Sequence, residues 1–566
     1  MFIVKKTIKG SVYYYLRKSV RVDGKVKAKT LAYLGKDKSE AEKKAKEYLD
    51  ESSRDSKSHK TKSIKNSMEK EKEKSSNIFK TTNIKISIEE LTNFCKRKGF
   101  VYPSGEIYGG LAGFWDYGHL GTEFKNNIKK AWWKFHVQKR MDIVGIDGSI
   151  ITNPKVWEAS GHVRSFVDIA VVCKKCGTKS KVDKHELDTA TCEKCDGELE
   201  SKGEFNPMFT TLVGPIKDDS TLAYLRPETA QLIFSNFKLV QENARLKLPF
   251  GIAQIGKSFR NEIAPRNFIF RCREFEQMEI EYFIDPEKSE EVPQDLKKIQ
   301  NLKVNIYSSQ MQEKNLDPIK MKISAALKNS LIKLPWHAYW LATELNWFIG
   351  LGANINNFRL RQHTKEEKSH YATDTWDIEY EFPFGWKELE GIADRGTYDL
   401  EEHEKFSKKD LKIITGNSKK ILPMVVAEPS LGVERAFIVF MLEAYSNSEK
   451  KNIILKLNPL LSPIKVAILP LVKKDKNLVK ISMKIYNSLK ENFNATYDET
   501  GSIGRRYARN DEIGTPFCIT IDNDSIINSD VTIRNRDNGE QKRISIDSIE
   551  DILRKLISGN LKFKEL

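Results

Sequence analysis

The sequence predicts an α+β protein: a large body built on a mixed, largely antiparallel sheet, followed by a small C-terminal α/β domain. Residues 252–282 contain two stretches in which polar and apolar residues alternate, as in an antiparallel strand pair. Residues 463–566 alternate between strand-like and helical stretches, which is typical of an α/β domain. The length of 566 residues suits several domains with a large core.

The formal net charge of +17 is concentrated near the start of the chain. Residues 1–83 contain 23 Lys and Arg but only 11 Asp and Glu, and so hold +12 of the total. Attraction to nucleic acid is therefore expected mainly there. No apolar run reaches the roughly 18 residues needed to span a membrane, and the start lacks the apolar core of a secretion signal. We expect a cytoplasmic protein with no membrane partner.

The first 50 residues form a small basic hairpin-and-helix unit of unknown role. Two strand-like stretches flank Asp23-Gly24, a favoured hairpin turn, and Ser39 with Glu42 forms a capping box before a helix. The unit resembles an N-terminal segment found in some transposases. Residues 51–83 are predicted to be a disordered charged linker, because they contain few apolar residues to bury.

Residues 84–450 form the predicted body. A helix is expected from Ile88 to Gly99, where the glycine suits the C-terminal end. Another is expected over 123–141, where Phe124 and Ile128 begin a helical repeat of apolar residues. The remaining expected segments are a strand over 142–154, a cysteine-bearing insertion over 168–204, and a polar, mostly helical insertion over 286–370.

The strand pair at 252–282 is predicted to have one apolar and one polar face. Ala253, Ile255 and Phe259 point to the apolar side of the first strand. The polar side is rich in Arg and Glu, which suggests a surface that handles anions, although a half-solvated sheet would show the same alternation. The residues expected on the polar face are Gln254, Gly256, Ser258, Arg260, Glu262, Arg271, Arg273, Phe275, Gln277, Glu279 and Glu281.

Four of the seven cysteines form two CxxC pairs separated by 15 residues, Cys173 with Cys176 and Cys192 with Cys195. This spacing is typical of a four-thiolate zinc ribbon. Four protein ligands leave no open position on the metal, so the predicted Zn²⁺ is structural. A ribbon with reduced, metal-free thiols is the alternative.

A third stretch, MVVAEPSLGVERAFIVFMLEAY at 424–445, places Arg435 at the start of an apolar helix. The free backbone N–H groups of a helix start, together with an Arg, suit a polyphosphate. Arg260 and Arg271 are predicted to contribute to the same site. Each arginine, taken alone, is also compatible with a solvated surface position.

The motifs resemble those of class II aminoacyl-tRNA synthetases. FRNE (259–262) with RCREFEQMEIE (271–281) is similar to motif 2, EPSLGVER (428–435) to motif 3, and the helix at 123–141 with the following strand to motif 1. The details resemble the homodimeric glycyl-tRNA synthetases of class IIa. Further segments that carry the resemblance are 99–121, 152–162, YLRPETAQ (224–231) and GWKELEGIADRGTYDL (385–400), and GRRYARNDEIGTPF (504–517) resembles the anticodon-binding domain.

The resemblance implies a two-step reaction: glycine and ATP form glycyl-adenylate, and tRNA(Gly) then accepts the glycyl group. It implies that Arg260, Glu262 and Arg435 are catalytic, through contacts with the α-phosphate, the adenine and the γ-phosphate. Phe275 would stack on the adenine and Arg271 would help to hold the nucleotide. Glu428 and Glu388 would bind the Mg²⁺ that accompanies ATP.

A glycine pocket must bind an ammonium group and leave no room for a methyl group. The resemblance implies that Glu228, Glu279 and Ser430 form this pocket, with Arg395 orienting the carboxylate. Three alternatives stay open: Glu228 as a first-turn helix residue, Ser430 as a helix N-cap, and Arg395 as a structural ion-pair partner.

Two other functions stay open at this point. A non-catalytic relative that acts as a nucleic-acid-binding accessory subunit would share the fold, but it would be expected to lose the arginines that bind the nucleotide. A zinc-ribbon DNA-binding protein would leave Glu228, Glu279 and Glu428 unexplained. The expected partners are ATP, glycine, tRNA(Gly) and a second copy of the chain.

Overall fold

The computed structural model shows two compact units, Met1–Thr81 and Thr82–Leu566. The predicted linker at 51–83 lies outside the described residues. Those that the structure describes are 2–8, 11–22, 25–44, 86–182, 190–192, 194–215, 221–367, 372, 374–416, 418–447 and 453–566.

The first unit is a three-stranded antiparallel sheet with a short helix. The predicted hairpin consists of β2 (Ser11–Val22) and β3 (Lys25–Gly35), and the turn residues Asp23 and Gly24 lie outside the described residues. A strand that was not predicted, β1 (Phe2–Ile8), pairs with β2. The helix begins at residue 38 and is capped by Asp37, which accepts the N–H groups of residues 39 and 40, so the predicted Ser39–Glu42 capping box is wrong.

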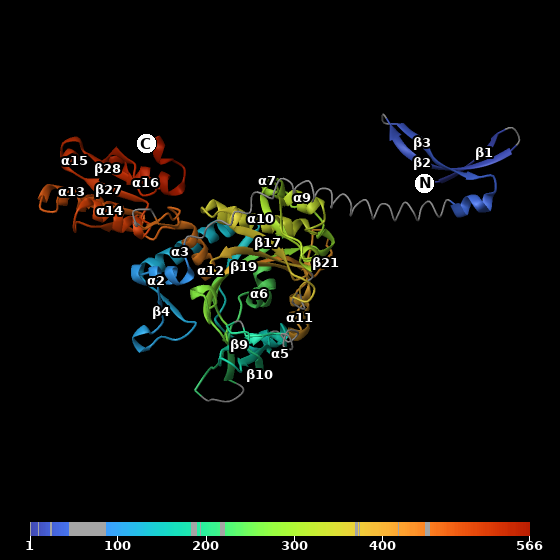
Figure 1. The fold of residues 1–566 in the computed structure, drawn as a ribbon, viewed down its shortest axis with the longest axis horizontal. Helices are drawn as coiled ribbons and strands as arrows, with labels where there is room; N and C mark the ends of the chain where they lie inside the picture. Colours follow the sequence, from blue (N-terminus) through green and yellow to red (C-terminus); the bar gives the residue numbers. More distant parts are fainter. Residues whose placement is uncertain are drawn as a thin grey trace. The chain divides into compact units, whose positions relative to one another are not determined.

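A nine-stranded sheet forms the centre of the second unit (Figure 1). Its pairs are antiparallel except β13 with β6 and β15 with β17, which confirms the predicted mixed, largely antiparallel sheet. Its strands, in spatial order, are β16 (Ile319–Lys322), β15 (Lys303–Tyr307), β17 (Phe358–Gln362), β18 (Asp374–Phe382), β19 (Gly385–Asp394), β22 (Met424–Gly432), β14 (Glu274–Ile284), β13 (Phe250–Phe259) and β6 (Ile143–Ile146).

The segment 286–370 contains more helix than strand, as expected, but it is not the polar insertion expected from its sequence. It supplies β15, β16 and β17, which extend the central sheet. It also contains α10 (Pro335–Gly350), whose Trp340 and Leu345 are fully buried. The segment therefore belongs to the core of the body. Its apolar stretches are short and are flanked by charged turns, so the sequence pattern did not identify them.

Helices cover both faces of the sheet. Residues of α10 and α12 (Val433–Ala444) share one apolar core with Met278 and Ile280 of β14. On the other face α6 (Ala230–Asn243) packs on β13 and β14 through Phe234 and Phe283. Figure 1 shows β17 and β19 between α10 on one side and α6 on the other.

The helix expected at 123–141 begins four residues earlier. It is α3 (His119–Trp133), followed by one π turn (Lys134–Gln138). Its N-cap is Gly118, which has no side chain to provide a capping signal. The helix expected after Ser87 is α2 (Ile88–Lys98), and Gly99 ends it in the left-handed conformation.

The cysteine-bearing segment and the C-terminal domain each have their own sheet. The first contains β8 (Asp168–Cys173), β9 (Lys179–Val182) and β10 (Leu199–Phe205). The second confirms the predicted α/β alternation. Its elements are β25 (Val466–Pro470), α13 (Lys476–Leu489), β26 (Ala495–Tyr497), α14 (Ile503–Glu512), β27 (Phe517–Ile521), α15 (Asn523–Asn528), β28 (Asp530–Asn535), β29 (Gln541–Ser545) and α16 (Ile549–Ser558).

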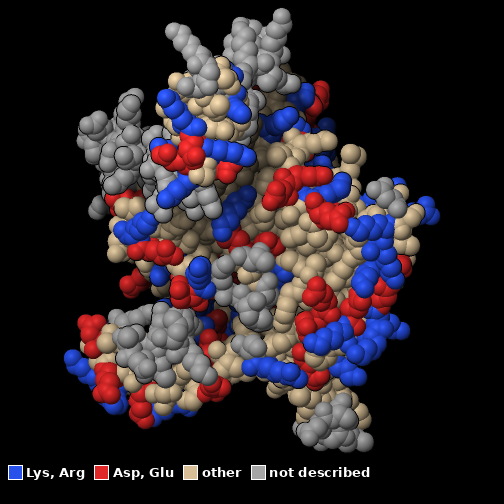
Figure 2. All heavy atoms as spheres, turned by 90° about the vertical axis from the view of Figure 1, so that its right-hand side faces the viewer, with Lys and Arg blue, Asp and Glu red and all other residues tan. Residues whose placement is uncertain are grey.

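The surface in Figure 2 carries basic and acidic side chains intermixed, without a large field of one sign. This agrees with the small excess of basic residues after residue 83. In the part of the chain that the structure describes, we find no helix that combines the length and the apolar character needed to cross a membrane.

Candidate active site

The register of the central sheet brings residues from five strands into one polar row. Glu279 of β14 lies opposite Gln254 of β13 and Ser430 of β22. Ser430 lies opposite Gly391 of β19, which in turn lies opposite Asp377 of β18. Directly paired residues place their side chains on the same face, so the predicted polar face of the strand pair extends across the sheet.

Glu279 is fixed in the centre of this row. Its carboxylate accepts hydrogen bonds from the hydroxyl groups of Ser430, at 2.7 Å, and Thr229. The side chain is 1% exposed. Burial raises the pKa of Glu279, and the nearby charge of Glu228 raises it further.

Glu228 lies just before α6, so it is not a first-turn helix residue. Its carboxylate contacts His162 Nε2 at 3.2 Å and accepts from Gln231 Nε2 at 3.1 Å. Burial alone would raise the pKa of Glu228. The charges of His162, Arg395 and Arg260 together outweigh burial and lower the pKa well below its ordinary value. Glu228 therefore stays ionised. The other ring nitrogen of His162 lies 2.8 Å from the Ser160 hydroxyl.

Glu428 and Glu281 add two more buried carboxyl groups. One oxygen each of Glu279, Glu281 and Glu428 lie within 4.8 Å of one another. Burial raises the pKa of Glu428 to about 8, with Glu279 and Glu228 adding to the rise and Arg395 opposing it. Burial also raises the pKa of Glu281 well above its ordinary range. Both oxygens of Glu281 lack a hydrogen-bond partner among the described residues, so the cluster can accept a cation.

Arg395 closes this end of the site from one side. Its Nε and Nη2 bind both carboxylate oxygens of Asp399, at 2.7 and 2.8 Å, and its Nη1 binds Glu428 at 2.8 Å. The bidentate pair with Asp399 fixes the plane of the guanidinium. In this structure Arg395 is thus an ion-pair partner within the site, which is the alternative role left open for it by the sequence.

The other end of β14 is half-buried and basic. The Arg260 guanidinium lies 5.5 Å from the Phe275 ring centre and 5.7 Å from that of Phe166, and its Nε donates to the Pro227 carbonyl. Glu262 and Arg271 form an ion pair at 3.3 Å. The first strand ends at Phe259, so Arg260 and Glu262 lie in the loop that follows, not on the strand as expected.

Arg435 faces this end from α12. Its Nη1 binds a carboxylate oxygen of Glu388 at 3.0 Å, and its guanidinium lies 4.7 Å from the Phe270 ring centre. The positive charge of Arg435 lowers the pKa of Glu388, and Arg260 contributes as well. The charge of Arg260 lowers the pKa values of both Glu388 and Glu228, so it is felt at both ends of the site.

Glu388 and Glu428 do not form the predicted shared Mg²⁺ site. Glu428 pairs with Ala393, five residues after Glu388 on β19, which is about 16 Å along the strand. Glu428 lies with the buried glutamates, whereas Glu388 is half-exposed beside Arg435. The sequence could not reveal this, because the two residues come from separate motifs whose register only the sheet sets.

Ser430 is not a helix N-cap, because β22 continues through Gly432, which caps α12 itself. Gly391, between Ser430 and Asp377, leaves open space: a Cβ built there meets no atom within 4 Å. Beyond it, the Asp377 carboxylate lies within hydrogen-bond distance of His363 Nε2, at 2.8 Å. The row thus has side chains at both ends and a gap at Gly391.

The four cysteines lie together as predicted for a metal site. Their sulfur atoms all lie within 4.8 Å of one another, with Cys173 and Cys195 3.5 Å apart and Cys176 and Cys192 3.6 Å apart. A tetrahedral Zn²⁺ with Zn–S bonds of about 2.3 Å requires sulfurs about 3.8 Å apart. A Cβ at Gly197 would lie 2.9 Å from Cys173 Sγ, so glycine keeps this space free.

Several residues of the site were not predicted. These residues are His162, Gln231, Thr229 and Asp399. Gln231 Nε2 links Asp399 to Glu228, which joins α6 to α11 (Tyr398–Ser407). A usable signal was the position of Thr229 and Gln231 inside YLRPETAQ (224–231), of Asp399 inside GWKELEGIADRGTYDL (385–400) and of His162 at the end of the segment 152–162.

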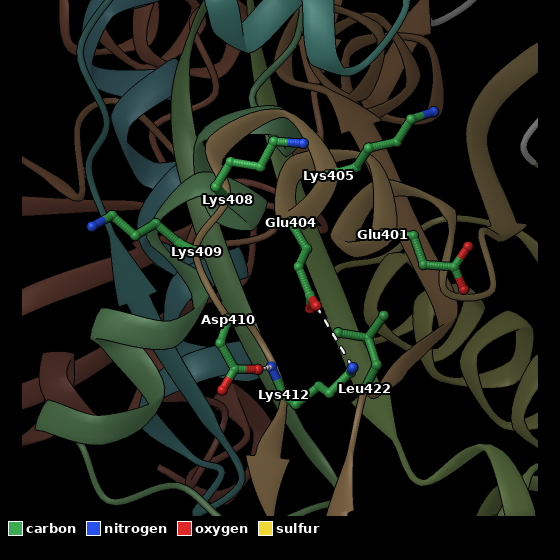
Figure 3. A pocket seen from close by; sticks show the side chains of 8 residues that line it. All are labelled: Glu401, Glu404, Lys405, Lys408, Lys409, Asp410, Lys412 and Leu422. Atoms are coloured by element: carbon green, nitrogen blue, oxygen red, sulfur yellow. Dashed lines mark hydrogen bonds and ion pairs between the residues drawn. The ribbon is translucent and has the colours of Figure 1, made fainter.

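A separate pocket of about 630 Å³ lies at the C-terminal end of α11 (Figure 3). Its lysines are partly paired: Lys412 contacts Glu404 at 3.6 Å, and Lys405 contacts Glu402 at 3.3 Å. None of the predicted site residues lines it. The polar row, not this pocket, gathers the predicted chemistry.

Comparison with known proteins gives the class first. Residues 215–499 match the tRNA synthetase class II core domain (G, H, P, S and T), and residues 465–556 match an anticodon binding domain. Two crystal structures of prolyl-tRNA synthetase from Cryptosporidium parvum share the fold, with TM-scores of 0.52 and 0.51 at 13% identity, covering 85% of this chain and 79% and 77% of theirs. The body is a class II synthetase core.

The particular family follows from sequence relatives. A glycine–tRNA ligase from Thermobifida fusca is 43% identical over 501 residues, covering 84% of this chain and 98% of that protein. One from Acetivibrio thermocellus is 43% identical over 498 residues, covering 82% and 97%. The chain belongs to the glycine–tRNA ligase family, which confirms the resemblance found in the motifs. Residues 3–74 are similar instead to the IS1634 family transposase N-terminal domain.

Proposed function

We propose that this protein uses ATP to join glycine to tRNA(Gly) through a glycyl-adenylate intermediate. The observation that carries the proposal is the group of four buried glutamates at one end of β14, with basic and aromatic side chains at its other end. The four are Glu228, Glu279, Glu281 and Glu428. Family membership supports it independently. The reaction needs little covalent chemistry from the protein, because positioning and charge stabilisation supply most of the rate enhancement.

The glutamate end is the proposed glycine pocket. Ionised Glu228 and hydrogen-bonded Glu279 attract the ammonium group, and Ser430 holds Glu279 in place. A β-carbon would have to enter a space bounded by buried carboxylates, which cannot be desolvated without cost. Arg395 lies against this end through Asp399 and Glu428. It acts on the glycine carboxylate from there.

The basic end is the proposed ATP site. The adenine would lie against Phe275, with Glu262 beside its amino group and Arg271 holding Glu262. Arg260 and Arg435 would bind the phosphates, and Arg260 is placed to stabilise charge at the α-phosphate. Mg²⁺ neutralises the polyphosphate when bound, and the half-exposed Glu388 is the residue of this chain that would face it. Glu428 is left to the glycine pocket.

The remaining assignments complete the proposal. The four cysteines hold a structural Zn²⁺, because their sulfur spacing suits a tetrahedral ion. Residues 465–556 bind the anticodon arm of tRNA(Gly). Residues 84–450 act as the catalytic domain of a cytoplasmic homodimer. These points rest on the family resemblance and on the spacing of the residues.

Glycine-dependent exchange of pyrophosphate into ATP tests the proposal directly. The full chain should catalyse exchange with glycine and about 100-fold or more slowly with alanine, since the pocket excludes a methyl group by steric and desolvation effects. The absence of exchange with any amino acid would favour a non-catalytic accessory subunit. No described feature favours that alternative at present, because Arg260, Arg271 and Arg435 all face the site.

A further inference from the structure

The first unit has an aromatic face that the glycine–tRNA ligase function does not use. Tyr13 and Tyr15 lie on β2, and Tyr33 lies on β3 opposite Tyr15. The Tyr33 ring centre is 5.4 Å from that of Tyr15 and 6.2 Å from that of Tyr13. The three rings therefore form a continuous group, which we call the tyrosine face.

The opposite side of the same sheet is the buried one. Leu16 and Leu34, which alternate with the three tyrosines, are 1% and 2% exposed and pack with Ala41 of the helix at 38–44. The helix therefore covers one side of the sheet. On the tyrosine face Tyr33 remains 54% exposed, although large aromatic side chains lose favourable burial when they face water.

Arg17 and Lys36 bring positive charge to the tyrosine face, and the sequence around them is basic. Residues 1–36 contain ten Lys and Arg and a single acidic residue, Asp23. Lys36 Nζ lies 5.2 Å from the Tyr13 ring centre, in cation–π geometry, and Arg17 extends the row of Tyr13 and Tyr15 along β2. Rings on a rigid sheet combined with basic side chains fit a ligand that has both flat apolar groups and negative charge.

We propose that the tyrosine face binds single-stranded nucleic acid, with unpaired bases stacked on Tyr33 and its neighbouring rings and phosphates held by Arg17 and Lys36. Stacking requires bases that are not paired, because a duplex offers its phosphates and groove edges but hides the base faces. The same chemistry is available in RNA and in DNA. The unit would give the enzyme a second nucleic-acid site, separate from the anticodon-binding domain.

The test uses the full chain and fluorescently labelled single strands of about 12 nucleotides, a length within the usual range of site sizes. Oligo(U) and oligo(dT) distinguish RNA from DNA, and an unlabelled duplex serves as competitor. Tyr33→Leu should weaken single-strand binding by about 5- to 150-fold, the range that corresponds to one stacked base. Leucine keeps the apolar contact and suits a strand, so the sheet should remain folded.

Two matched variants separate stacking from other effects. Tyr33→Phe keeps the ring and should bind as the unchanged chain does. Tyr108→Leu makes the same replacement at a tyrosine of the second unit that is 88% exposed, and should leave binding unaltered. Glycine-dependent pyrophosphate exchange should be equal in all variants, so a failure here is distinguishable from a failure of the ligase proposal.

Two results would overturn the proposal. The first is that neither Tyr33→Leu nor the double variant Tyr15→Leu with Tyr33→Leu weakens single-strand binding. The other is duplex that competes as strongly as single strands, which would indicate a purely electrostatic surface. Tighter binding of oligo(U) would assign RNA as the ligand, and tighter binding of oligo(dT) would assign DNA.

Discussion

The two ends of β14 present the same alternating pattern but differ in burial and charge. Phe275, at one end, is half-buried beside the Arg260 guanidinium, and Glu262 and Arg271 form an ion pair in the loop between β13 and β14. Glu279 and Glu281, about 13 to 20 Å further along the strand, are fully buried with Glu428. Burial raises the pKa values of Glu279, Glu281 and Glu428 at the acidic end, whereas the charge of Arg435 lowers the pKa of Glu388 at the basic end.

Under the proposed function, this difference lets one strand select two unlike ligands. Glutamates that α6 and Arg395 seal from water can recognise a small cation by charge and size. Arginines that remain open to solvent can follow a long polyanion. The contrast leads to five predictions, from the largest expected effect to the smallest.

Removing the charge at the acidic end should nearly abolish glycine use. Glu279→Gln keeps the size of the side chain but loses the attraction for the ammonium group. We expect kcat/KM for glycine in pyrophosphate exchange to fall by about 100- to 1,000-fold, while ATP binding measured by calorimetry changes less than about threefold. Glu274→Gln, on the same strand but paired with Lys257, is the matched control. A loss of ATP affinity equal to the loss in glycine use would show that the two ends are not separate.

The reciprocal change at the basic end is Arg435→Ala. It removes the guanidinium that contacts Glu388 and Phe270, so the KM for ATP should rise by about tenfold to 100-fold. The KM for glycine should stay nearly constant, since the partner of Arg435 is Glu388 and not one of the buried glutamates of the acidic end. Steady-state kinetics with each substrate varied in turn measures both values, and an equal rise in both would contradict the division.

Glycine binding should depend on pH through Glu428. Its pKa of about 8 means that the folded protein holds a proton there below that pH, and an ammonium ligand favours the ionised form. Glycine binding should therefore release a proton, and affinity should fall by up to about tenfold for each pH unit below 8. Calorimetry in buffers of different ionisation enthalpy measures the release. Glu428→Gln should remove this dependence, whereas a flat profile in the unchanged chain would contradict it.

Loss of His162 should affect the acidic end mildly. His162 helps to keep Glu228 ionised and in place, so His162→Gln should raise the KM for glycine a few-fold, by about 1 kcal/mol of binding free energy. The KM for ATP should not change. A larger effect on kcat than on KM would mean that His162 takes part in the chemical step.

Deleting residues 1–83 should leave adenylate formation within about twofold of the full chain, because the whole of β14 and its partners lies in the second unit. Pyrophosphate exchange measures this, and melting of the truncated protein serves as its control. A collapse of exchange in a protein that still melts cooperatively would place part of the site in the first unit.

Much of the site was visible in the sequence because local patterns carry it. Period-two alternation identified the faces of β13 and β14, and the CxxC spacing identified the sulfur cluster. What alternation cannot give is the third strand: β22 comes some 150 residues after Glu279, so the proximity of Ser430 to that glutamate was expected from the family resemblance and not from the pattern.

The failures have similar causes. The strands of 286–370 are short, and their buried residues belong to a core that they share with α10, which lies between β16 and β17 in the sequence. The start of α3 at His119 has no side-chain cap. Asp399 belongs to the site because Arg395, four residues earlier and just before α11, forms an ion pair with it, a pairing that becomes meaningful only once the surroundings are known to be buried.

Gly391 has a consequence for redesign. It lies in the polar row between Ser430 and Asp377, and the fold itself does not require a glycine there, because a Cβ would touch nothing. Most positions around the glutamates are tied to the stability of the core through buried hydrogen bonds. At position 391, by contrast, the proposed site can be narrowed one methyl group at a time while the sheet and its helices keep their packing.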